Sequence, residues 1–183
     1  MKQLTIPAFF LLLAFVAQAQ GFTKIDAHAR STPFPQKQDT KALAQALSVG
    51  CTTEKEKVRA FFVWIADNIK YDIKSFENRS DTDPKEQEEK QNPQHVLRAK
   101  KAVCAGYSNL LIALCKESGI KALRVDGITK NYRGTVSRAG HAWCLVRADG
   151  TWGLIDATWG AGDVDFDEGR YHEHFKENYF FSP

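Results

Sequence analysis

The residue whose position most suggests chemistry is Cys104, which opens a segment with helical periodicity. From Cys104 to Ser118 the apolar side chains recur every three or four residues, and Gly119 follows as a helix stop. The free N–H groups and the positive dipole end of a helix start favour a thiolate and could stabilise an oxyanion. These features predict a thiol nucleophile, with a buried packing cysteine as the alternative.

A predicted β-hairpin supplies a histidine and a carboxylate on one face of a sheet. Asp149-Gly150 is a strong two-residue turn signal between two short alternating segments. Counting outward from that turn, Asp156 stands opposite Trp143 and diagonal to His141, within reach of the imidazole. A one-residue slip would send Asp156 to the opposite face. For each residue alone, the alternative is a hydrogen-bonded core histidine and a carboxylate that caps the strand end.

Together, Cys104, His141 and Asp156 fit the logic of a Cys-His-Asp triad. The thiol is the nucleophile, the imidazole takes its proton, and the carboxylate orients the imidazole, which are the parts that acyl transfer requires. The same three residue types are acceptable zinc ligands, but no fourth ligand is placed nearby in the sequence. We therefore expect no metal at these residues.

A small set of helices and strands must position these residues. The strongest helix is predicted through KVRAFFVWIADNIKYD, where apolar residues recur at helical spacing after a capping box formed by Thr53 and Glu56. Shorter helices are expected at 39–48 and 94–101, and strands at 121–128, 141–148 and 151–158. The pattern predicts an α+β fold in which the helix that carries the nucleophile packs on an antiparallel sheet.

Two stretches lack a clear period. Residues 21–38 contain two prolines and scattered polar side chains, and we expect an extended arm there. Residues 78–92 are almost wholly polar, which predicts a long surface loop that is either mobile or part of the binding site. The predicted organisation is a signal peptide at 1–19, an N-terminal arm with a short helix at 20–50, and one catalytic domain at 51–183.

The N-terminal segment has the pattern of an export signal. Lys2 supplies a positive end, Ile6 to Ala17 is apolar, and Ala17-Gln18-Ala19 has the small-x-small cleavage pattern. The apolar run is well short of the roughly 20 residues that a membrane-spanning helix needs. We expect cleavage after Ala19, a secreted or periplasmic location, and no membrane attachment afterwards.

Charge and acidic patterning exclude several partners. Without Lys2, 24 basic and 22 acidic residues remain, and no basic cluster interleaves with aromatics, so nucleic acid is not expected. Asp163, Asp165 and Asp167 alternate but lack the glycine and the closing glutamate of a calcium loop. The remaining His-x-His pair, His172 and His174, is expected at the surface, without a metal. The oligomeric state is left open.

Four cysteines in an exported protein would ordinarily suggest two disulfides. Their spacings here form no metal pattern, and Cys51, Cys115 and Cys144 are expected to be small buried hydrophobes, with any bridge among them left open. Cys115 lies about 16 Å along the same helix from Cys104, too far for a bridge. We expect Cys104 to be free.

Three segments together resemble the transglutaminase-like superfamily, especially its branch similar to kyphoscoliosis peptidase. They are VCAGYSNL at Cys104, GHAWCLV at His141 and LIDATWGAG at Asp156, and their order and spacings of 37 and 15 residues fit that branch. The resemblance implies a papain-like core with these three residues as the catalytic triad and no cofactor. It also implies an activity among peptide hydrolysis, deamidation and transfer of an acyl group to an amine.

Further residues follow from the resemblance. Tyr71 matches a position that often carries an aromatic near the oxyanion, and we expect Trp143 and Trp159 to contact substrate. The chain departs from the branch at Cys144, where the branch usually has asparagine, and it ends at Pro183 where relatives tend to continue.

The resulting hypothesis is a secreted cysteine-dependent acyl-transfer enzyme that acts on amide bonds of a peptide or protein substrate. Because fold alone does not determine function, the alternative is a catalytically silent module that binds proteins or glycans.

Overall fold

The computed structural model describes residues 21–130, 136, 140–166 and 168–182. The expected signal peptide at 1–19 lies outside these residues, as do Asp167 of the acidic alternation and the terminal Pro183. Within the described ranges, no helix combines the length and the apolar character that crossing a bilayer requires.

An antiparallel sheet of four strands in the order β3-β4-β5-β8 carries the hairpin predicted from the turn signal. The strands are β3 (Lys121–Gly127), β4 (His141–Ala148), β5 (Thr151–Ile155) and β8 (Phe180–Ser182). Asp149 and Gly150 take φ values of 50° and 80°, as a two-residue hairpin turn requires. Ala148 pairs with Thr151, which confirms the predicted register.

The predicted strand at 151–158 is too long. It ends at Ile155 because Asp156 caps a short helix, α9 (Ala157–Ala161). Asp156 Oδ1 accepts hydrogen bonds from the N–H groups of Thr158 and Trp159 at 3.0 and 2.9 Å. Asp156 therefore follows the ladder at the end of β5 and does not pair with Trp143 within it.

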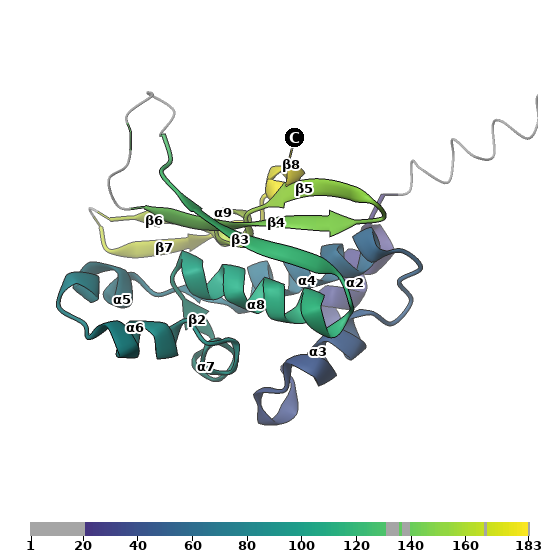
Figure 1. Cartoon of the computed structure of the whole chain (residues 1–183), viewed down its shortest axis with the longest axis horizontal. Coiled ribbons are helices and arrows are strands. Elements are labelled where there is room, and N and C mark those ends of the chain that lie inside the picture. The colour runs from purple at the N-terminus through teal and green to yellow at the C-terminus, as the bar shows by residue number, and fades with distance from the viewer. Residues whose placement is uncertain (1–20, 131–135, 137–139, 167, 183) are drawn as a thin grey trace, which may run out of the picture.

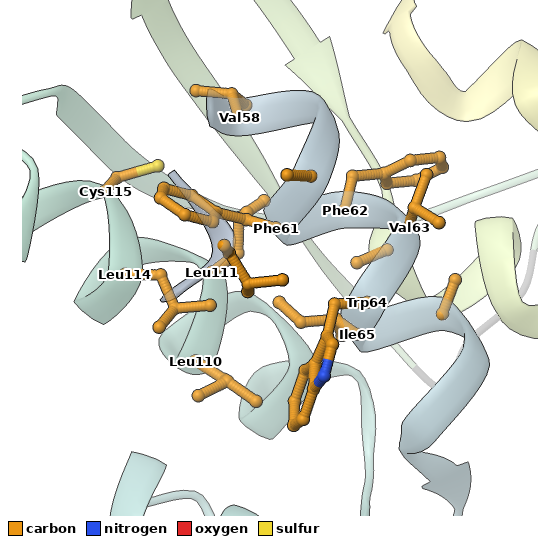
Figure 2. Close-up of a cluster of buried hydrophobic side chains, with 14 of the residues drawn as sticks. Val58, Phe61, Phe62, Val63, Trp64, Ile65, Leu110, Leu111, Leu114 and Cys115 are labelled. Atoms are coloured by element: carbon orange, nitrogen blue, oxygen red, sulfur yellow. The ribbon is translucent and has the colours of Figure 1, made fainter. Parts of the chain in front are cut away.

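Helices α4 (Glu54–Asn68) and α8 (Cys104–Glu117) cover one face of the sheet (Figure 1). The capping box is confirmed, since Thr53 and Glu56 exchange hydrogen bonds at the start of α4. Every residue from Val58 to Ala66 is buried, which makes α4 the central helix of the core. Figure 2 shows Phe61 of α4 directed toward Leu111 and Leu114 of α8.

The start of α8 is held by close packing. The preceding strand β2 (Lys101–Ala102) pairs in parallel with β1 (Lys70–Tyr71), which directly follows α4. A Cβ at Gly106 would lie 2.7 Å from the Cβ of Ala102, so glycine is needed for this approach. The buried face of α8 is the one that helical spacing predicted: Tyr107, Leu110, Leu111, Leu114 and Cys115.

The prediction of an extended arm at 21–38 is wrong. Residues Thr23–Ser31 form helix α2, which packs on α4 through Ile25 and Ala29. Only this single pair with i, i+4 spacing faces the core, so sequence periodicity could not reveal the helix. The chain continues through a 3₁₀ turn, η1 (Gln36–Gln38), to α3 (Thr40–Leu47), which confirms the helix expected at 39–48.

The prediction of an irregular loop at 78–92 is also wrong. The segment contains a 3₁₀ turn, η2 (Asn78–Ser80), and helix α6 (Pro84–Lys90), flanked by α5 (Ile73–Glu77) and α7 (Pro93–Ala99). Asp83 caps α6, and Glu86 pairs with Lys90 at 2.8 Å. Because α6 buries no side chain, it depends on local capping and charge pairing and shows no apolar period.

The C-terminal part returns to the sheet. After α9, strands β6 (Gly162–Asp165) and β7 (Arg170–Glu173) form a hairpin, and η3 (Glu177–Tyr179) leads into β8. The predicted fold class is confirmed: an α+β protein in which the cysteine-bearing helix packs on an antiparallel sheet.

Candidate active site

Cys104 is the first residue of α8 and is partly exposed. Its N-terminal neighbour Val103 provides no side-chain cap for the helix. Since the Gly106 and Tyr107 N–H groups donate to the Val103 carbonyl, the N–H groups of Cys104 and Ala105 are the ones left for a ligand, next to the thiol. The side chain of Cys104 lies close enough to that of His141 to influence the pKa of its imidazole, and both line the same cleft.

His141 is the first residue of β4 and links the thiol to a carboxylate. Its Nε2 lies 2.6 Å from Asp156 Oδ2, and the two side chains are only 8% and 11% exposed. Because each ring nitrogen serves one in-plane partner, this bond leaves Nδ1 for Cys104. The structure thus brings together the three residues that the motifs predicted.

The protonation of His141 is set by competing effects. Burial by itself lowers the pKa of the imidazole, but hydrogen bonds to Asp156 and Cys104, and the charges on both, raise it from 6.5 to about 9. The imidazolium form therefore predominates at neutral pH. A cationic imidazole beside a cysteine is the arrangement typical of nucleophilic thiols.

Asp156 is fixed by four hydrogen bonds with different partners. Its Oδ1 accepts from Thr158 and Trp159, its Oδ2 bonds to His141, and its own N–H donates to the carbonyl of Tyr179 at 3.0 Å. The alternatives considered for this residue, a cap and a partner of the histidine, hold at the same time. One carboxylate oxygen anchors the side chain and the other orients the imidazole.

Two tryptophans pack on the imidazole. The Trp159 ring lies 4.5 Å from it at an interplanar angle of 16°, and the Trp143 ring lies 5.8 Å away at 29°. Gly127, which pairs with His141 in the sheet, leaves room for the Trp143 indole, since a Cβ there would lie 2.6 Å from the ring. Both residues expected to contact substrate thus lie beside His141.

Tyr71 approaches the thiol from β1. It pairs with Ala102, two residues before Cys104. Burial, and then the charge of Cys104, raise the pKa of Tyr71 well above its usual value of 10. The phenol therefore keeps its proton at neutral pH and remains a hydrogen-bond donor near the Cys104 thiol.

A cleft of about 730 Å³ opens beside Cys104 and His141. Glu86, Gln87 and Lys90 of α6 line its far wall together with side chains of α5 and α7. The polar segment at 78–92, predicted to be either mobile or part of the binding site, therefore forms a wall of this cleft.

The remaining cysteines lie apart from this site, and all four cysteines are free thiols. Cys144 is on the buried face of β4, where its Sγ donates to the carbonyl of Ser108 at 3.5 Å, and burial raises its pKa to about 12. The departure from the usual asparagine therefore lies on the face of β4 opposite His141. Burial likewise raises the pKa of Cys115.

One further cluster was not visible in the sequence. Asp165, Glu168 and His172 bring ligand-type atoms within 4.8 Å of one another, while Glu168 also pairs with Arg170 at 3.1 Å. His172 and His174 are exposed, as expected. His172 thus has two acidic neighbours that only folding places there, Asp165 at the end of β6 and Glu168 in the β6–β7 loop.

A family profile and individual relatives both match this chain, and they indicate the same family. Residues 41–157 match the profile described as the transglutaminase-like superfamily. Kyphoscoliosis peptidase of Homo sapiens is 31% identical over 168 residues, which cover 89% of this chain and 24% of the relative. The Mus musculus protein is 30% identical over 166 residues, or 88% and 24%. The chain therefore spans about a quarter of the length of these curated relatives.

Among solved structures, the crystal structure of a TGase aligns with a TM-score of 0.48 and 22% identity. The alignment covers 76% of this chain and 33% of that one.

Proposed function

The chain belongs to the transglutaminase-like superfamily, and from that premise we propose that it is a cysteine-dependent acyl-transfer enzyme acting on peptide or protein amide bonds. Cys104 is the nucleophile, His141 the acid and base, and Asp156 the residue that orients the histidine. The observation that carries the proposal is the chain of contacts from Cys104 to His141 and on to Asp156 at 2.6 Å.

In the first half of the reaction, the Cys104 thiolate attacks the carbonyl carbon of the amide. We expect the backbone N–H groups at the start of α8 and the Tyr71 hydroxyl to stabilise the oxyanion. The His141 imidazolium then donates its proton to the amide nitrogen, and the C–N bond breaks. A free amine leaves, and a thioester remains on Cys104.

In the second half, water or a primary amine attacks the thioester carbonyl. Neutral His141 takes the proton of the attacking group, the C–S bond breaks, and the Cys104 thiolate returns. Water gives hydrolysis or deamidation, and an amine gives acyl transfer. Asp156 stays hydrogen-bonded to the imidazole throughout and stabilises its charged form.

The predicted signal peptide at 1–19 supports a secreted or periplasmic location for this reaction. N-terminal sequencing of the protein recovered from the outside of an expressing cell tests this part independently. A mature N-terminus at Gln20 is expected, whereas an intact Met1 would contradict it.

Alkylation with iodoacetamide at pH 6, followed by peptide mapping, tests the nucleophile. Cys104 should be labelled at least about tenfold faster than Cys51, because it lies at a helix start beside His141, where reactive cysteines are found. Cys51 is a matched control, since it is also partly exposed. Burial, then the charge of Glu56, raises its pKa above 9.0.

Two variants complete the test. His141→Ala should slow alkylation of Cys104 at pH 6 and move its pH profile toward higher pH. A burst of nitrophenol from p-nitrophenyl acetate should occur with the unaltered chain and disappear with Cys104→Ala. Equal labelling of Cys104 and Cys51, together with no burst, would leave the silent binding module as the function.

The acceptor can be identified with dimethylcasein and dansylcadaverine. Fluorescence incorporated into casein indicates transfer to an amine, and new α-amino groups without incorporation indicate hydrolysis. Cys104→Ala is the blank in both measurements.

A further inference from the structure

A second hollow lies on the side of His141 that does not include Cys104. It has a volume of about 230 Å³, and its apolar and aromatic lining consists of Trp143, Leu154, Ile155, Trp159 and Tyr179. Resting on the proposed function, we propose that this hollow binds an apolar side chain carried by the amine that leaves or enters during acyl transfer. The enzyme would then prefer a large apolar residue immediately after the bond that it breaks.

The position of the hollow beside His141 indicates that it binds the amine. The proposed mechanism has His141 donating its proton to the departing nitrogen, so the amine must lie on the histidine side of the thioester. The large cleft contacts both Cys104 and His141, whereas the second hollow contacts His141 alone. An amine attacking the thioester follows the same path in reverse and would occupy the same place.

The residues that line the hollow indicate that the bound side chain of the amine is apolar. Besides the indole N–H and phenol groups of the aromatic residues, the polar members of the lining are Thr129, Ser182, His141 and Asp156. His141 and Asp156 already bond to each other, and Asp156 also accepts from two backbone N–H groups. A charged side chain would therefore lose its hydration without gaining a partner. By contrast, charged residues such as Lys74, Glu86 and Asp126 line the large cleft.

The size and stiffness of the hollow fit an aromatic or branched side chain. A dry cavity of roughly 150 Å³ is enough to hold benzene, and this hollow is larger. Its wall is rigid, since the Trp159 ring stacks on His141 and meets the Tyr179 ring edge-on at 5.6 Å. Such a wall is set before substrate arrives, which favours selection by shape.

The test measures which amine the acyl-enzyme accepts. The full chain is acetylated on Cys104 with p-nitrophenyl acetate in equal mixtures of leucinamide, glycinamide and aspartic acid α-amide. The acetylated products are then quantified, with a small-molecule acetyl thioester correcting for the intrinsic reactivity of each amine. Leucinamide should be used about tenfold more than glycinamide, as burial of one branched side chain allows, and the aspartate amide least.

Variants of Leu154 locate the preference. Leu154→Glu should bring the leucinamide-to-glycinamide ratio close to one, and Leu154→Ala should enlarge the hollow and favour tryptophanamide over leucinamide. Leu123 is the matched control, because its pairing through Leu145 places it in the same cross-strand row as Leu154, outside the hollow. Leu123→Glu should keep the ratio. Using ratios cancels any change in overall rate.

The outcomes separate the two proposals. Without a nitrophenol burst from Cys104, the proposed function fails. A burst with no side-chain preference, or with preference for the aspartate amide, overturns the hollow alone. A leucine preference that survives Leu154→Glu also overturns it, since the selecting surface would then lie elsewhere.

Discussion

At the scale of single residues, the site depends on a carboxylate with two oxygens in two environments. Asp156 Oδ1 is held by backbone N–H groups at the start of α9, and this leaves Oδ2 no freedom except to face His141. The pair is almost excluded from water. Charge at Asp156 therefore acts on the imidazole with little screening.

This coupling predicts the titration of His141. Its pKa of about 9 lies above the ordinary 6.5, so the stabilisation of the imidazolium is complete below pH 6.5 and is lost as the pH rises through 9. Asp156→Asn should lower the pKa of His141, because burial then acts without the opposing charge. Because asparagine can still cap α9, the substitution removes the negative charge and keeps the cap. Titration of the imidazole C–H signals by NMR measures the shift.

Asp163→Asn is the control for this titration, since Asp163 is an exposed carboxylate that pairs with Lys176. It should leave the midpoint of His141 in place. An unchanged midpoint in Asp156→Asn would show that Asp156 does not set the charge of the imidazole.

At the scale of elements, the hairpin that carries His141 and Asp156 is tied to the central helix. The Asp149 carboxylate in the β4–β5 turn accepts from the N–H groups of Glu54 and Lys55 at 3.0 and 3.1 Å. In return, the Asp149 N–H donates to the Glu54 carboxylate at 2.7 Å. The turn thus caps α4 from outside and joins the two elements that position the site.

The tie predicts a stability difference between two substitutions. Asp149→Ala removes the acceptor and places alanine at positive φ, so it should lower the free energy of unfolding by about 1–2 kcal/mol. Asp149→Asn keeps an acceptor and tolerates the left-handed conformation, so its loss should be smaller. Urea unfolding of the three proteins measures both. Equal losses would show that the carboxylate does not act as a cap.

At the scale of the whole molecule, one buried arginine joins the two ends of the described chain. Arg59 of α4 is 2% exposed and pairs with Asp26 of α2 through two bonds of 2.8 and 2.7 Å. It also approaches Glu177, 3.4 Å away in the C-terminal segment. Aromatic rings from the same regions surround the guanidinium: Phe22, Phe62, Phe175 and Phe180.

Arg59→Met should therefore destabilise the entire molecule. Breaking a buried ion pair leaves Asp26 without its partner and should cost about 2–4 kcal/mol, toward the low end because Asp26 is 20% exposed. The control Arg30→Met removes the more exposed pair with Asp67 and should cost less than about 1 kcal/mol. Denaturant unfolding compares them, and similar costs would contradict the joining role of Arg59.

We expect the lower stability of Arg59→Met to be accompanied by detachment of α2 from α4. In Arg59→Met, limited proteolysis should cut between α2 and α3 sooner than in the unaltered chain. A cleavage rate equal to that of Arg30→Met would indicate that α2 is held by its apolar contacts alone.

Local signals in the sequence were sufficient for the elements around the site. The box formed by Thr53 and Glu56, the apolar period after Cys104 and the Asp149-Gly150 turn each act within a few residues, so α4, α8 and the β4–β5 register could be predicted. The motifs also named the residues that meet at the candidate site. Helix caps, apolar periodicity and turn geometry depend on neighbouring residues alone, so they can be recognised without knowing which distant segments pack together.

Other features were decided only by tertiary structure. Helix α2 is stabilised by burial of Ile25 and Ala29 and by the Asp26–Arg59 pair, whose partners are 33 residues apart. The stacking of Trp159 on His141 likewise depends on where α9 returns to the sheet.

The sequence by itself therefore determined which residues are candidates for the site and the elements that carry them. The tertiary structure decided that one oxygen of Asp156 bonds to His141 and the other to the backbone of α9. It also decided that α6 lines the cleft beside Cys104 and that an apolar hollow adjoins His141. The physical reason is the distance along the chain over which each kind of interaction acts. Backbone propensities and turns are local, whereas protonation, enclosure and shape depend on groups that only folding brings into contact.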